Sequence, residues 1–192
     1  MKCRSGSLKL RPATRTASVC HWLSWVLCAF VLRSAAVHAH SASDAYLNLT
    51  VDKTTQWDKL VVHGQWDIAL RDLEFVLKLD DDGDGRLTWG EVRHHQSAIE
   101  HYAYGYLHLD GGPGNTCAVK PTRQMVDSHA DGAYVALFFD VQCTRVPTKL
   151  TLVYNLFFAI DPSHRGIVVM RSGANLATAV LSPQNAKIEL TL

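Results

Sequence analysis

The second half of the chain is divided into short apolar or alternating segments by clusters of turn residues, and this pattern restricts the fold more than any other feature. The segments are 6 to 12 residues long, and clusters such as "DPSHRG" and "RSGAN" separate them. Segments of this length and composition predict strands that pair in an antiparallel arrangement. The six predicted strands cover residues 117–126, 133–143, 149–160, 166–172, 177–182 and 186–192.

The residues before this region predict two further strands and then two helices. Residues 44–51 alternate between apolar and polar side chains, which is the period of a half-buried strand, and residues 59–70 predict a second strand that forms a hairpin with it. Apolar residues at helical spacing predict one helix over 69–79 and another from Trp89 to about Leu107. The breaker cluster "DGGPGN" ends the second helix.

This order of elements predicts the fold class α+β, as an antiparallel β-sandwich with an inserted helix–loop–helix at about 69–107. The insertion of roughly 40 residues is small for a core of its own, so we expect it to pack on the sheet. Residues 40–192 are therefore predicted to form a single β-rich domain.

The first 39 residues have the features of a signal peptide. A basic stretch without acids, "MKCRSGSLKLRPATRT", precedes the 14-residue apolar run "VCHWLSWVLCAFVL", which is shorter than the ~20 residues of a spanning helix. Val37 and Ala39 supply small residues for cleavage after Ala39, which leaves His40 as the mature N-terminus. An uncleaved signal anchor is the alternative. We expect an exported protein, periplasmic or extracellular.

Cleavage changes the net charge. The leader holds six of the 19 Lys and Arg residues and no acid, so the mature chain has 13 basic and 18 acidic residues. This balance does not support a nucleic-acid-binding surface, and export argues against one independently.

Two cysteines remain after the leader, Cys117 and Cys143. An even pair in an oxidising compartment predicts a disulfide. The two residues flank a predicted pair of strands around the turn "DSHADG", so antiparallel pairing would bring them together. A metal site built from two cysteines alone and a catalytic thiol are the weaker alternatives.

An acidic segment between the two predicted helices has the spacing of a calcium ligand set. Residues 80–91, "DDDGDGRLTWGE", match the pattern D-x-[DN]-x-[DN]-G-x5-E at every required position. The predicted ligands are Asp80, Asp82 and Asp84, Arg86 through its backbone carbonyl, Thr88 directly or through a water, and Glu91.

The chemistry of calcium explains this spacing. Ca²⁺ takes about six to eight oxygen ligands, so three alternating aspartates surround it and a bidentate glutamate closes the far side. Gly85 permits the sharp turn, whereas Asp81 contributes only negative potential. Without a cation the carboxylates would repel one another. The alternative is a solvated acidic turn with no ion.

The segment and its flanks resemble an EF-hand, a helix–loop–helix family of calcium-binding motifs. His95 and Gln96 depart from the family, because the exiting helix is usually apolar there. EF-hands normally pair, yet the nearest second match, "DSHADGAYVALF", has Phe138 in place of the closing glutamate. A solitary exported hand implies an affinity on the order of 10⁻⁵ to 10⁻³ M and a structural rather than a sensing role.

Several further segments together resemble the extracytoplasmic N-terminal region of HupE/UreJ family membrane proteins. They are "HSASDAYLNL", "GQWDIALRDLE", "DDDGDGRLTWGEV", "DGAYVALFF" and "IDPSHRG". That family is associated with nickel or cobalt uptake and continues into membrane helices, which this chain lacks after the leader, so we expect a stand-alone version or a truncated product. The resemblance implies an exported metal-related domain, with a membrane protein as a candidate partner.

The histidines and the catalytic motifs leave one alternative function open. His40, as a free N-terminus, could chelate copper or nickel, whereas His94 and His101 stand seven residues apart, about 10 Å along a helix, too far to share an ion. We interpret His94, His95 and His101 as surface residues. The sequence has no catalytic signature, and the turn "DPSHRG" explains Asp161 and His164 by backbone geometry. The chain is thus predicted to bind calcium without catalysis, or alternatively to handle nickel, cobalt or copper.

Overall fold

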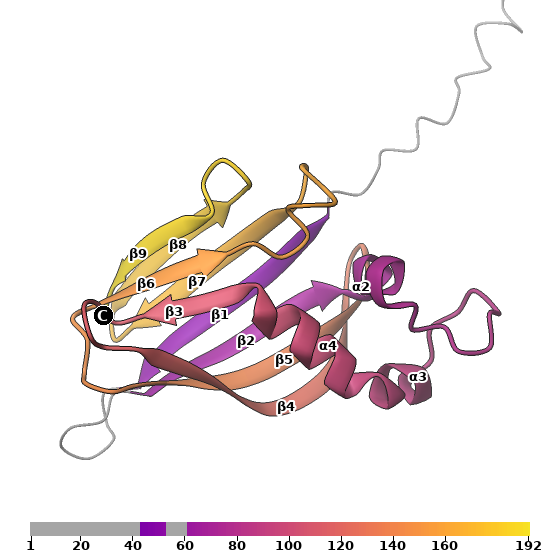
Figure 1. Cartoon of the computed structure of the whole chain (residues 1–192), viewed down its shortest axis with the longest axis horizontal. Coiled ribbons are helices and arrows are strands. Elements are labelled where there is room, and N and C mark those ends of the chain that lie inside the picture. The colour runs from indigo at the N-terminus through magenta and orange to yellow at the C-terminus, as the bar shows by residue number, and fades with distance from the viewer. Residues whose placement is uncertain (1–42, 53–60) are drawn as a thin grey trace, which may run out of the picture. The chain divides into compact units, whose positions relative to one another are not determined.

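The computed structural model describes residues 43–52 and 61–192 (Figure 1). The predicted signal peptide, its cleavage site and His40 lie outside the described residues. The elements are β1 (Asp44–Asp52), β2 (Val61–Ala69), α2 (Leu70–Leu77), α3 (Trp89–His94), α4 (Gln96–Gly105), β3 (Leu107–Asp110), β4 (Cys117–His129), β5 (Gly132–Cys143), β6 (Lys149–Tyr154), β7 (Arg165–Ser172), β8 (Asn175–Leu181) and β9 (Lys187–Thr191).

The strands form two sheets. The larger has six strands in the order β4-β5-β2-β1-β7-β8, and the smaller has three in the order β3-β6-β9 (Figure 1). The α+β class and the predominance of strands are confirmed, as is the hairpin of β1 with β2, in which Ala45 lies opposite Ile68.

The expectation of a purely antiparallel arrangement is wrong for one pair. Strands β1 and β7 run parallel, with Asp44 opposite Arg165, so the larger sheet is mixed. A hairpin turn forces its two strands to be antiparallel, but β1 and β7 are joined through most of the chain and have no such constraint.

The structure also differs from the prediction for the second helix. It is broken at His95 into α3 and α4, and the chain leaves helical conformation after Gly105. Leu107 and Leu109 are buried and alternate with exposed residues in β3, where Leu107 pairs with Tyr154 of β6. Pairing with a distant strand overrides the helical period in this segment.

The core lies between the two sheets and beneath α4. Trp66 of β2 is fully buried, and its ring centroid lies 5.5 Å from that of Tyr154 in the small sheet and 6.4 Å from that of Tyr104 in α4. Ile99 and Ala103 of α4 are also fully buried. The helical segment therefore packs on the sheets, which agrees with its small size.

The predicted disulfide is confirmed. Cys117 and Cys143 lie directly opposite one another in the pairing of β4 with β5 and are bonded. Such a bond is typical of proteins in an oxidising environment outside the cytosol. Among the described residues, none of the helices combines the length and the apolar character that crossing a bilayer requires.

A buried histidine links segments that are far apart in the sequence, including α2 and β6. His164 is fully buried, and its Nδ1 lies 2.6 Å from the hydroxyl of Ser43 while its Nε2 lies 2.7 Å from the hydroxyl of Tyr154. The Ser43 hydroxyl in turn donates to Asp72 of α2 at 2.8 Å. Burial of the imidazole lowers the pKa of His164 to about 4, so the ring is neutral at physiological pH.

One glycine allows a close contact within the larger sheet. Gly64 of β2 lies opposite Phe139 of β5, and a Cβ at Gly64 would come within 2.2 Å of the buried Phe139 ring. We expect Gly64→Ala to lower the free energy of unfolding by about 1–3 kcal/mol through overpacking, as measured by chemical denaturation.

Gly105 provides the matched control for this substitution. It ends α4, and a Cβ there would meet no atom within 4 Å. Gly105→Ala should leave stability unchanged or raise it by up to about 1 kcal/mol, because alanine restricts the unfolded chain. Equal stability of the two variants would contradict the packing argument.

Candidate metal centre

The end of α2 fixes the position at which the acidic loop begins. Lys78 follows the helix in the left-handed conformation, with φ 55°, and its N–H donates to the Glu74 carbonyl. The Glu74 carboxylate then accepts hydrogen bonds from the N–H groups of Leu79 and, at 3.0 Å, Asp80. Leu79 is fully buried, so the residue that precedes the loop is anchored to the core.

Asp80 organises the first half of the loop. Its two carboxylate oxygens accept hydrogen bonds from the N–H groups of Gly83 and Gly85, each at 2.8 Å. Both glycines have left-handed φ angles, 73° and 78°, which residues with a side chain rarely adopt. These bonds, chiefly the one from Gly85, hold the pKa of Asp80 below its usual value.

Two further aspartates continue this pattern and bring three carboxylates together. Asp82 accepts from the N–H of Asp84 at 3.1 Å, and Asp84 accepts from the N–H of Arg86 at 2.8 Å. As a result, one oxygen each from Asp80, Asp82 and Asp84 lie within 4.8 Å of one another. This exposed acidic cluster could bind a metal ion.

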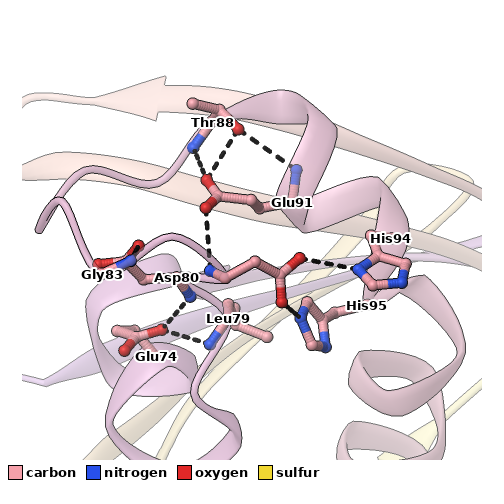
Figure 2. A network of polar contacts seen from close by, with 9 residues as sticks. Glu74, Leu79, Asp80, Gly83, Thr88, Glu91, His94 and His95 are labelled. Atoms are coloured by element: carbon pink, nitrogen blue, oxygen red, sulfur yellow. Dashed lines mark hydrogen bonds and ion pairs between the residues drawn. The ribbon is translucent and has the colours of Figure 1, made fainter.

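Two of the three remaining predicted ligands, Thr88 and Glu91, lie at the start of α3 and contact each other (Figure 2). Thr88 is the N-cap, and the N–H of Glu91 donates to its hydroxyl at 3.3 Å. In return, one carboxylate oxygen of Glu91 accepts from the Thr88 N–H and hydroxyl, both at 2.8 Å. The other oxygen accepts from the N–H of Asp81 at 3.0 Å. These bonds, first the one from the Thr88 N–H, lower the pKa of Glu91.

The structure therefore brings together three of the four predicted carboxylate ligands. The carboxylates of Asp80, Asp82 and Asp84 converge, whereas Glu91 is outside this group and occupies the capping box of α3. Since Glu91 spans from Thr88 to the backbone of Asp81, it lies across the loop (Figure 2).

A second group of potential ligands was not predicted from the sequence. The two carboxylate oxygens of Asp81 lie 2.8 Å from Nδ1 of His94 and 2.8 Å from Nε2 of His95 (Figure 2). The hydrogen bond with His94, followed by that with His95, lowers the pKa of Asp81. In the sequence, the signal for this group was His95, a polar residue at a position that is usually apolar in EF-hands. No local pattern could reveal its contact with Asp81, because that contact depends on the helix break.

Comparison with known proteins gives no family and no relative. A scan against models of known families found no match, and a search of curated proteins found none. The similarity to the HupE/UreJ family therefore stays a prediction.

Proposed function

We propose that this chain is an exported, non-catalytic calcium-binding protein and that its helix–loop–helix is a solitary EF-hand. The observation that carries the proposal is the convergence of the Asp80, Asp82 and Asp84 carboxylates within 4.8 Å. We further propose that the bound ion has a structural or interaction-mediating role rather than a signalling one.

The type of ligand favours a hard cation. All three converging groups are carboxylates, and oxygen is the donor that Ca²⁺ takes in proteins. Three negative charges at this separation repel one another, and a divalent cation would reverse that effect. Gly85, which follows the third of these aspartates, permits the sharp turn that a calcium-binding loop of this kind requires.

Glu91 would complete the site by changing partners. A bidentate glutamate at the last loop position normally closes the coordination of calcium, so Glu91 would release the N–H groups of Asp81 and Thr88. Its own N–H could keep the bond to the Thr88 hydroxyl, which leaves the cap of α3 partly intact. Exchanging existing hydrogen bonds for ion contacts weakens binding, in agreement with an affinity on the order of 10⁻⁵ to 10⁻³ M.

Calorimetric titration with Ca²⁺, Mg²⁺, Ni²⁺ and Cu²⁺ in turn tests the proposal. We expect Ca²⁺ to bind, and Asp82→Asn and Glu91→Gln each to weaken it at least about tenfold, because each removes a charged oxygen ligand. Asp127→Asn is the matched control, since it makes the same change at an exposed site in β4. Calcium binding that survives Asp82→Asn, or its absence at millimolar concentration, would contradict an ion in this loop.

A second candidate function is the handling of nickel, cobalt or copper, which the HupE/UreJ resemblance implies. The two imidazoles that contact Asp81 favour it, because imidazole suits these metals. The N-terminal site that the sequence predicts at His40 is tested separately. Metal binding there would be abolished by His40→Ala and would be retained in Glu91→Gln.

A further inference from the structure

The junction between α3 and α4 carries a group of three side chains that the calcium proposal does not use. We propose that Asp81, His94 and His95 form a second metal site, which binds a divalent first-row transition-metal ion of the Zn²⁺ type. Its donor set of two imidazoles and one carboxylate differs from the all-carboxylate set of the calcium loop, although Asp81 stands in that loop between Asp80 and Asp82.

The separation of the three ligand atoms suits one small ion. One ring nitrogen each of His94 and His95 and one carboxylate oxygen of Asp81 all lie within 4.8 Å of one another. Around a tetrahedral Zn²⁺, ligand atoms at 2.0–2.1 Å from the metal are about 3.3 Å apart. Each imidazole nitrogen lies 2.8 Å from a different oxygen of the Asp81 carboxylate, so both N···O separations are within about 0.5 Å of that spacing.

The break in the helix explains how two adjacent histidines reach one carboxylate. Successive residues of a continuous helix point in different directions, so a His-His pair cannot normally share a ligand site. Here α3 ends at His94, and His95 has φ −88° and ψ 9° before α4 begins. Their ring centroids are 5.0 Å apart, and both rings approach the same carboxylate (Figure 2).

The site is open to solvent on one side. The side chain of His94 is 72% exposed and that of Asp81 is 43% exposed, whereas that of His95 is 22% exposed. An ion can therefore reach the ligands directly, and water can fill the remaining coordination position, as in zinc sites with three protein ligands.

The donor atoms select against calcium. Two of the three ligand atoms are imidazole nitrogens, which suit Zn²⁺, Cu²⁺ and Ni²⁺, whereas Ca²⁺ and Mg²⁺ take oxygen ligands. Imidazole binds a metal in its neutral form, so Asp81 alone would supply a negative charge to the ion. The competing explanation is purely structural: the histidines hydrogen-bond Asp81 and hold the loop against the junction.

Titration of purified protein, expressed from the full chain, with Zn²⁺ alone tests the site. We expect one Zn²⁺ to bind and His95→Gln to weaken its affinity at least about tenfold. Even the loss of a residue that only hydrogen-bonds a metal ligand lowers metal affinity by about 10- to 100-fold. Glutamine can still donate to Asp81, so this variant keeps the structural contact. Absorption of the Co²⁺-loaded protein gives a second readout, in which tetrahedral bands should be strong in the wild type and lost in His95→Gln.

Two further variants separate this site from its alternatives. His101→Ala, an exposed histidine of α4, should bind Zn²⁺ as the wild type does. Asp82→Asn should retain Zn²⁺ even if calcium binding is lost, which distinguishes failure of this site from failure of the calcium loop. The proposal is overturned if Zn²⁺ does not bind, if binding survives His95→Gln, or if binding is lost with Asp82→Asn.

Discussion

Replacing Cys117 and Cys143 together by alanine is expected to lower the free energy of unfolding by about 3.5 kcal/mol. The two residues are separated by 26 positions and close the loop made by β4 and β5. A crosslink of this length restricts the unfolded chain far more than the folded one, in which pairing already fixes both ends. Removing the disulfide should destabilise β4 in particular, because β4 is an edge strand with β5 as its neighbour in the sheet.

Denaturation with and without a reductant measures this effect. Reductant should bring the wild type to the stability of the double variant and leave the variant unchanged. If the oxidised wild type and the variant unfold at the same denaturant concentration, the disulfide contributes nothing, and the chain-entropy explanation fails.

The second large effect concerns pH and the buried His164. Its pKa is about 4 in the folded protein, against 6.5 for the free side chain. As pH falls below 6.5 the unfolded chain takes up this proton first, so the folded state loses stability until about pH 4. The difference between the two pKa values corresponds to a loss of about 3 kcal/mol in the free energy of unfolding between pH 6.5 and 4. Above pH 6.5 the titration of His164 no longer changes the stability.

His164→Gln isolates this contribution from that of the carboxylates. The variant should be less stable than the wild type at pH 7, because it disturbs the contacts with Ser43 and Tyr154. The difference between the two proteins should then shrink by about 3 kcal/mol between pH 6.5 and 4. His108→Gln makes the same change at an exposed position of β3 and is the matched control. A constant difference between His164→Gln and the wild type would show that the ring is not held neutral.

Local sequence patterns predicted most of the secondary structure. The alternation of Leu47, Leu49 and Val51 predicts the buried face of β1, since all three are buried. Turn clusters mark the ends of most later strands, but the strand predicted over 149–160 was wrong in its second half, because β6 ends at Tyr154. The disulfide was predictable for the same reason, because the strands that bring Cys117 and Cys143 together are neighbours in the chain.

Features that depend on distant pairing could not be predicted in this way. Strand β3 continues a helical pattern and becomes a strand only by pairing with β6, and the direction of β7 is set by β1. The acidic loop was visible because its ligands are spaced along one segment. The contact of Asp81 with His94 and His95 bridges 13 and 14 positions, and it requires a helix break that no single residue signals.

The parallel pairing of β1 with β7 has a consequence for the order of folding. Strand β1 lies in the interior of the larger sheet, yet one of its two neighbours is made only when synthesis reaches Arg165–Ser172. Contacts of such long range slow folding, and until they form one edge of β1 stays open to other chains. A nascent chain of this protein therefore cannot complete its larger sheet until most of the chain has been synthesised.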